Sequence, residues 1–187
     1  MEFNNNIWKL YFIHFFRQFH FFGAISVPFF LEWLRVDYTK MFILQSWFVF
    51  WVFVLEVPTG VIADKYSRKL SIVLSAVFLS SSFFMWGFIT NYYFLFLAEF
   101  LAAIGFTLLS GADKALLYDS LSDENKIDSK IFFSRYESAG TIGIIIAFPV
   151  GSIIAGSSLF PYPKGLPFTF IMTGFSVLIM LFIALSL

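Results

Sequence analysis

The 187-residue chain has no cysteine and few charged residues. Without cysteine it has no disulfide bonds, no thiolate metal site and no thiol nucleophile. Charged residues make up 13% of the sequence, whereas soluble domains carry about 25%. Acidic and basic residues balance to zero net charge, which does not favour nucleic acid as a partner.

Signatures of enzymes are also missing. The sequence contains no H-E-x-x-H motif, no nucleophile elbow, no glycine loop for phosphate and no paired carboxylates at metal-ligand spacing. We therefore expect that the protein is not an enzyme and that it has neither a cofactor nor a metal site.

The chain is rich instead in apolar and aromatic residues, at 59% and 22%, with 29 phenylalanines and a mean hydropathy of +0.84. A membrane-spanning helix needs about 20 mostly apolar residues. Six runs meet this requirement, at about 8–30, 41–62, 70–90, 92–112, 133–156 and 166–187. The sequence predicts an all-α membrane protein with six transmembrane helices in one domain, residues 1–187. We expect tryptophans such as Trp86 to anchor the chain at the interface or to face lipid.

The distribution of basic residues predicts the orientation, because lysine and arginine in short loops stay on the cytoplasmic side. A cytoplasmic N-terminus leaves Arg35, Lys40 and Lys164 outside and Arg17 in the membrane. The remaining eight of the 12 basic residues then lie inside: Lys9, Lys65, Arg68, Lys69, Lys114, Lys126, Lys130 and Arg135. We expect a multi-pass protein of the cell's inner (plasma) membrane with its N-terminus in the cytoplasm.

A short charged turn, Gly60-Val-Ile-Ala-Asp64-Lys65-Tyr-Ser-Arg68-Lys69, separates the second and third apolar runs. Its spacing resembles the motif between the second and third spans of the major facilitator superfamily, except that Ser67 stands where the family usually has glycine. The resemblance implies the N-terminal six-helix half of a twelve-helix secondary transporter, with three helices related to the next three as an inverted repeat. It also implies a small-molecule substrate near the midplane.

In the family this motif latches the cytoplasmic side against the C-terminal half. The resemblance implies that Asp64 is the latch acid, that Lys65, Arg68 and Lys69 position it, and that Gly60 permits close helix approach. From the residues alone, Asp64 can pair with Arg68 or with a helix N-terminus elsewhere. The alternative is an ordinary basic cytoplasmic loop.

A second group of charges lies near the same predicted face. We expect Glu56, which stands near the cytoplasmic end of its span, to join a gate network with Asp113, Lys114, Arg135 and Glu137. Such a network would cluster Asp113 with Asp64. The alternative is a solvated helix end followed by a surface loop.

Polar residues within the apolar runs are candidates for the substrate or proton path. His14, Arg17 and Gln18 share a helical face in the first run, and His20 lies on its flank. An imidazole can exchange a proton near neutral pH; the alternative for either histidine is a hydrogen-bonded structural residue. Glu99 of the fourth run is expected to pair with Arg17 or to accept a proton. It departs from the drug-antiporter branch of the family, which often has an arginine nearby.

The fifth run carries small residues at every fourth position, including Gly143 and Gly151, and Pro149 is expected to kink it. Close helix packing explains these residues at least as well as a role in coupling does.

Together these features predict secondary transport of a small solute, with proton-coupled efflux of drug-like molecules or metabolites as one form. The predicted partners are the lipid bilayer, protons and a C-terminal six-helix half, in the same chain or in a second copy. The last run reaches Leu187 without a basic flank, which favours the front half of a longer chain over a natural half-length protein. The alternative function is a membrane subunit or receptor-like assembly protein without transport of its own.

Overall fold

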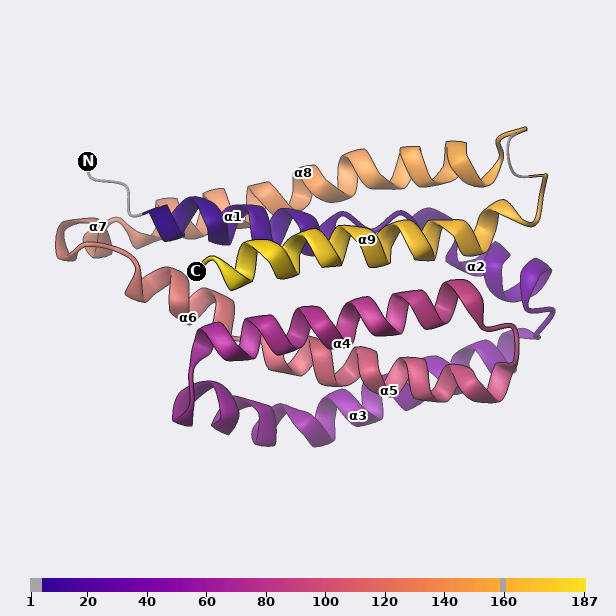
Figure 1. The fold of residues 1–187 in the computed structure, drawn as a ribbon, viewed down its shortest axis with the longest axis horizontal. Helices are drawn as coiled ribbons and strands as arrows, with labels where there is room; N and C mark the ends of the chain where they lie inside the picture. Colours follow the sequence, from indigo (N-terminus) through magenta and orange to yellow (C-terminus); the bar gives the residue numbers. More distant parts are fainter. Residues whose placement is uncertain (1–4, 159–160) are drawn as a thin grey trace.

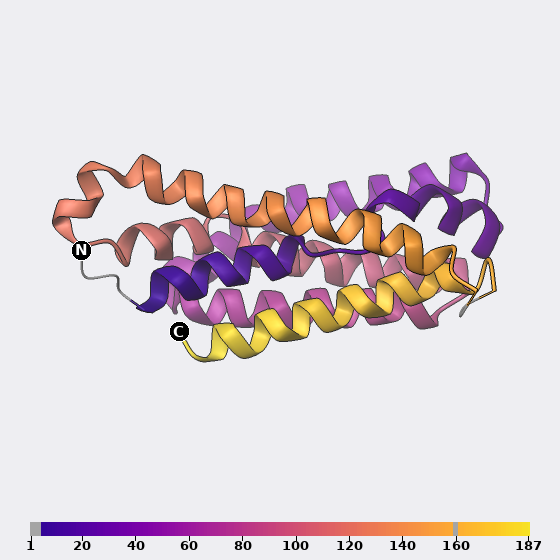
Figure 2. The ribbon, with the colours of Figure 1, turned by 90° about the horizontal axis from the view of Figure 1, so that it is seen from above.

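Long helices run side by side along the whole length of the molecule (Figures 1 and 2). The computed structural model describes residues 5–158 and 161–187, and this part of the chain contains helices and no strand. The long helices are α1 (Asn5–Gln18), α3 (Tyr38–Lys65), α4 (Arg68–Phe88), α5 (Tyr92–Leu109), α8 (Ser129–Ala155) and α9 (Gly165–Leu185). The short ones are η1 (Gly23–Ile25), α2 (Ser26–Pro28), η2 (Phe29–Trp33), α6 (Ala112–Asp119) and α7 (Asp123–Ile127).

Five helical segments of the described residues are long and apolar enough to cross a membrane. They are Tyr38–Lys65, Arg68–Phe88, Tyr92–Asp119, Ser129–Ala155 and Gly165–Leu185, where the third combines α5 and α6. Their ends lie within a few residues of the second to sixth predicted spans, apart from the third segment, which α6 extends. The protein is therefore a helical, multi-pass membrane protein.

The first predicted span, residues 8–30, is not the continuous helix that the sequence predicts. Helix α1 ends at Gln18, the chain is non-helical from Phe19 to Phe22, and three short helical pieces follow. Gly23 and Pro28 both weaken an α-helix here, Pro28 because it has no N–H to donate. His14, Arg17 and Gln18, predicted to share a helical face, all lie on α1, whereas His20 lies in the interruption after it.

Helix α9 supplies hydrogen-bond partners for the interrupted backbone, and helix α8 packs closely against it. The Phe21 N–H donates to Thr173 Oγ1 at 2.9 Å, and Ser176 Oγ donates to the Phe16 carbonyl oxygen at 2.8 Å. A Cβ on Gly151 would overlap the Phe21 carbonyl. Broken helices persist in membranes where neighbouring side chains satisfy the freed backbone groups, and two hydroxyls of α9 do so here.

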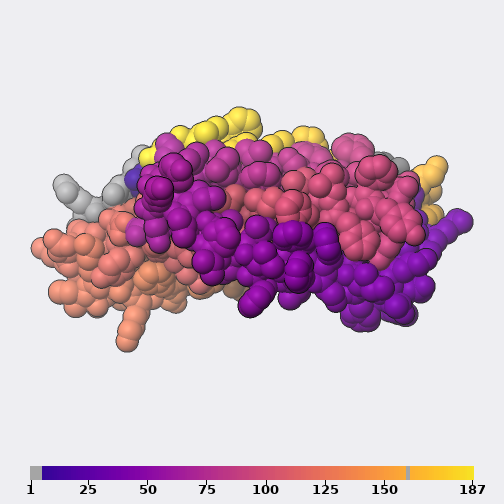
Figure 3. All heavy atoms as spheres, turned by 90° about the horizontal axis from the view of Figure 1, so that it is seen from below, coloured from indigo at the N-terminus to yellow at the C-terminus, as the bar shows by residue number. Residues whose placement is uncertain are grey.

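The helices form two groups that meet along α4 and α9. One group contains α1, α8 and α9, and the other contains α3, α4 and α5 (Figure 1). Within the second group, α3 packs mainly on α5 and lies on the surface of the molecule (Figure 3). Its outer side chains are largely uncovered, with Phe53 at 82% exposure and Val57 at 76%.

Side-chain caps begin the helices of the second group. Asp37 accepts from the Lys40 N–H at 2.8 Å to start α3, and Asn91 accepts from the Tyr93 N–H at 3.0 Å to start α5. Capping of this kind satisfies the unpaired N–H groups of a first turn.

At the same end of the bundle, Tyr162 forms a hydrogen bond with Glu32, and this bond raises the pKa of the Tyr162 phenol.

Candidate functional site

The charged turn between α3 and α4 is tied to the ends of two other helices. The Ser67 hydroxyl accepts from the Leu70 N–H and caps α4, which gives serine a structural role at this position. Arg68 donates to the Asp119 carboxylate and to the Ala115 carbonyl in α6, and Lys69 Nζ donates to the Leu185 carbonyl at 2.9 Å. Cations at helix C-termini are favourable, so these bonds fix the turn against α6 and α9.

Asp64 and Gly60 face away from these contacts. Asp64 does not pair with Arg68, contrary to one of the two pairings predicted for it, and none of the other described residues forms an ion pair with it. A Cβ placed on Gly60 would meet no atom within 4 Å, so no helix of the described chain lies close to Gly60. The two residues are four apart, so they share one face of α3. That face is open.

An ion pair between a buried acid and a partly buried arginine lies where α1, α6 and α8 meet. Asp113 is 2% exposed, and its carboxylate lies 3.7 Å from Arg17 Nη1 and accepts from the Tyr136 hydroxyl. A buried charge needs a partner and hydrogen bonds to be tolerated. Arg17 and Tyr136 supply both for Asp113.

A second pair extends this arrangement toward the surface. Lys114 Nζ lies 2.8 Å from one Glu137 oxygen, and His14 Nε2 lies 3.5 Å from the other. The His14 ring is 3% exposed and stacks on Tyr136 with centroids 4.0 Å apart. The structure therefore joins two sets that the sequence analysis kept apart, since predicted path residues His14 and Arg17 contact predicted gate residues. We call this set the charged cluster: His14, Arg17, Asp113, Lys114, Tyr136 and Glu137.

Other predicted residues lie outside the charged cluster. Glu56 accepts from the Ser110 hydroxyl at 2.7 Å on the exposed side of α3. Arg135 lies in an open groove between α1 and α8, beside Trp8 and Tyr11. The predicted clustering of Asp113 with Arg135 is therefore wrong, because adjacent positions on α8 point Arg135 and Tyr136 in different directions, and Tyr136 is the one that meets Asp113. Asp64 forms no ion pair with a described residue of the charged cluster.

The other predicted residues of the broken segment and of α8 pack against neighbouring side chains and backbone. The His20 ring lies against Phe22 and Phe148, and its Nδ1 is buried without a hydrogen-bond partner. Gln18 lies beside Gly140, while a Cβ on Gly143 would come within 2.8 Å of the Phe15 carbonyl. Helix α8 stays helical through Pro149.

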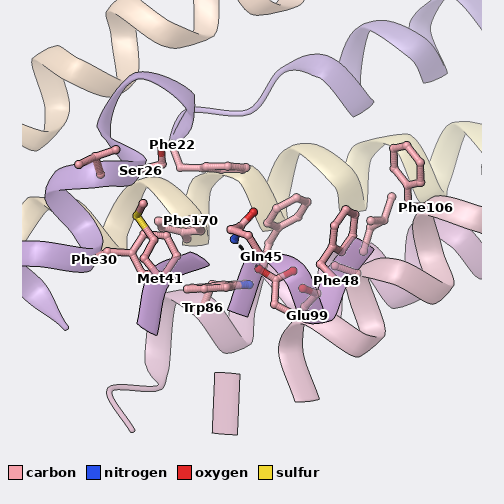
Figure 4. Close-up of a pocket in the computed structure, with 15 residues that line it drawn as sticks. Phe22, Ser26, Phe30, Met41, Gln45, Phe48, Trp86, Glu99, Phe106 and Phe170 are labelled. Atoms are coloured by element: carbon pink, nitrogen blue, oxygen red, sulfur yellow. Dashed lines mark hydrogen bonds between the residues drawn. The ribbon is translucent and has the colours of Figure 1, made fainter. Parts of the chain in front are cut away.

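A cavity of about 400 Å³ lies among the broken first segment, α3, α4, α5 and α9 (Figure 4). Its lining is Phe22, Ser26, Val27, Phe30, Met41, Gln45, Phe48, Leu79, Ser82, Phe83, Trp86, Glu99, Ala102, Phe106 and Phe170. Pockets of about 300–1,000 Å³ that are mainly apolar with a few polar groups are typical small-molecule sites. Trp86, which the sequence analysis placed at the interface or against lipid, is instead 5% exposed and part of the cavity wall.

Glu99 is the one acid in this lining, and it is 6% exposed. Gln45 Nε2 donates to Glu99 Oε1 at 2.9 Å (Figure 4). The predicted pair between Glu99 and Arg17 does not form, because Arg17 faces Asp113 instead. Sequence reasoning missed Gln45, although a signal was present. Each residue stands seven positions after its helix start, so both lie about 10 Å from the same end of the bundle.

No profile of a known protein family matches this chain, and no curated protein shows a significant match to it. Among residues 5–158 and 161–187, no group of three or more histidine, aspartate or glutamate side chains has an arrangement that could hold a metal ion. The candidate site is therefore defined by its geometry, as an aromatic cavity with a buried carboxyl and a separate charged cluster.

Proposed function

We propose that this chain is one six-helix half of a secondary transporter of small solutes of the major facilitator type. The observation that carries the proposal is the cavity between the helices, with Glu99 and Gln45 in an otherwise mainly aromatic wall. Five candidate spans plus the broken first segment give six passages along the bundle. A broken helix beside a central cavity is a recurring feature of transporters.

The open face of α3 supports the proposal that a second half completes the protein. Gly60, Asp64 and the exposed Val57 lie on a helix that is poorly covered by the rest of the chain. A second six-helix half, in the same chain or as a second copy, would cover this face and close the cavity. Alternating access would then follow from rocking of one half against the other.

The test is transport by protein reconstituted into liposomes with an imposed pH gradient. A defined mixture of small solutes is offered, and those retained in the liposomes are measured by mass spectrometry. We expect at least one solute to move only when the protein is present, and we expect Asp64→Asn to abolish that movement while expression is retained. Asp128→Asn, which removes an acid from the loop before α8, is the matched control. Failure of correctly inserted protein to move any solute argues against transport, and normal flux with Asp64→Asn removes the latch role.

The exposed side of α3 also favours a second candidate, a membrane subunit that assembles without transporting. Because the chain has no cysteine, one introduced cysteine reports on one position. Val57→Cys is expected to form a disulfide-linked pair if two copies meet through α3. Phe182→Cys, at an exposed position on α9, is the control for random collision. Cross-linking together with an absence of flux would favour the subunit.

A further inference from the structure

We infer that the cavity binds a monovalent organic cation with aromatic or other apolar groups, and that this cation and a proton compete for Glu99. The inference rests on the proposed function and deepens it, because it names the substrate class of the same site. Charge, ring contacts and the scarcity of polar groups each contribute to it.

The charge of the cavity has one sign. Glu99 is the only ionisable side chain in the lining, and Gln45 offers it a neutral donor. An ionised carboxylate buried without a cation is costly. For Asp113 this cost is offset by the counter-charge of Arg17 at 3.7 Å, whereas Glu99 has no counter-charge in the described chain. A proton or a bound cation can each supply it.

The walls suit an organic cation better than a metal ion. Trp86 and Phe170 stack with centroids 5.5 Å apart, Phe170 stacks on Phe22 at 4.6 Å, and Phe30 meets Trp86 edge-on at 5.5 Å. Aromatic faces attract cations through their quadrupoles and bury apolar groups. One carboxylate and one amide are too few oxygen ligands for a hard metal ion.

Other ligand classes fit this lining poorly. An anion would meet the Glu99 carboxylate and no basic side chain in the wall. A sugar needs several hydrogen-bonding partners, but the Ser82 hydroxyl is already donated to the Ala98 carbonyl at 2.8 Å. An anion or a sugar would therefore leave buried polar groups unpaired.

The charged groups around the cavity leave Glu99 as its titrating centre. From the first segment, Arg17 lies 5.4 Å from the centre of the Phe106 ring and is paired with Asp113, and His20 packs against Phe22. Helix α9 has no titratable side chain, and those of α4 are at its first two residues, Arg68 and Lys69. The titratable groups of α3 and α5 other than Glu99 lie toward the helix ends, among them Lys40, Tyr92 and Glu56.

The experiment compares two probes of the same shape and opposite charge. Tetraphenylphosphonium is a monovalent cation with four phenyl groups, and tetraphenylborate is the matching anion. Binding of each to purified protein in lipid nanodiscs is measured by equilibrium dialysis against empty nanodiscs. We expect saturable binding of the cation and binding of the anion weaker by about ten-fold or more, since the discriminating contact is to a charged group. This comparison needs no variant, and equal binding of the two ions overturns the inference.

Variants then locate the site. Glu99→Gln is expected to weaken cation binding by about ten-fold or more, and Glu124→Gln, which removes an exposed acid of α7, is expected to leave it unchanged. Wild-type protein is expected to bind the cation more tightly at alkaline than at acidic pH, and Glu99→Gln is expected to lose this dependence. Cation binding that does not change with Glu99→Gln overturns the inference.

The two proposals fail separately. Glu99-dependent cation binding without movement of any solute supports the binding site and argues against transport. If the protein moves solutes but does not bind tetraphenylphosphonium, the cation site is overturned and the transporter proposal stands.

Discussion

The bundle of α1, α8 and α9 differs from the side of the molecule formed by α3 and α5 in whether its buried charges and backbone groups have partners. In the first group, Arg17 faces Asp113, Thr173 satisfies the free Phe21 N–H, and Gly151 lies against the backbone of the broken segment. On the side formed by α3 and α5, a Cβ on Gly60 would meet no described atom within 4 Å, and Glu99 has an amide partner but no counter-charge among the described residues. Pairing of a buried acid and of a free backbone N–H contributes to stability, whereas a buried acid without a counter-charge and an uncovered helix face remain available to ligands and partners.

The largest expected effect comes from breaking the ion pair of the buried acid Asp113. Asp113→Ala leaves Arg17 without its partner and Tyr136 without its acceptor, so we expect a loss of about 3–5 kcal/mol of folding stability. Thermal unfolding in detergent micelles measures it. Asp123→Ala, which breaks the exposed pair with Lys126, is the control and is expected to cost less than about 1 kcal/mol. Wild-type stability in Asp113→Ala would show that the pair adds nothing.

A smaller effect is expected from filling the contact at Gly151. Gly151→Ala places a Cβ atom where the Phe21 carbonyl lies, so we expect destabilisation by about 1–3 kcal/mol. Gly60→Ala is the matched change on the open side and is expected to leave stability equal or raise it by up to about 1 kcal/mol. The same unfolding assay compares them, and equal losses would contradict the difference between the two sides.

Removing a hydroxyl from the broken segment should cost somewhat less. Thr173→Val keeps the shape of the side chain but leaves the Phe21 N–H unpaired, so we expect a loss of about 1–2 kcal/mol. In Thr141→Val the lost hydroxyl is exposed and bonds only the Glu137 carbonyl of its own helix, so its loss should be below about 0.5 kcal/mol. If hydrogen exchange at residues 19–22 stayed as slow in Thr173→Val as in the wild type, the bond would have no part in holding the break.

The smallest effect on stability is expected at Glu99. Glu99→Gln preserves the shape of the side chain and removes the ionisable group, and no ion pair is lost. We therefore expect the free energy of unfolding to change by no more than about 1 kcal/mol, measured by thermal unfolding in detergent micelles. A large loss would mean that Glu99 is a structural residue like Asp113. The contrast between Asp113→Ala and Glu99→Gln thus separates the two kinds of buried acid.

The ends of α3, α4 and α5 could be predicted because they are fixed locally. Asp37, Ser67 and Asn91 begin helices through bonds to residues two or three positions away, and long apolar runs follow them. The break after Gln18 could not be predicted in this way, because its partner Thr173 lies 152 residues along the chain.

For the candidate site, the sequence indicated how far along its helix Glu99 lies, but not which side chains it contacts. Glu99 stands within an apolar run and is buried, but of the two roles expected from the sequence, pairing with Arg17 or accepting a proton, the pairing does not form. Which acid meets Arg17 depends on the rotation of α5 and α6 about their axes, and an apolar run contains little information on rotation. For the same reason Arg68 pairs with Asp119 across 51 positions instead of with Asp64.

The interruption at Phe19–Phe22 has a mechanical consequence. Arg17, on one side of it, belongs to the charged cluster, while Phe22, Ser26 and Phe30, at and beyond it, line the cavity. A continuous helix would move both parts as one rod. Helical parts joined by a non-helical segment can move separately about it, so the short helical pieces after Phe22 can tilt and reshape the cavity wall while α1 stays anchored by its ion pair.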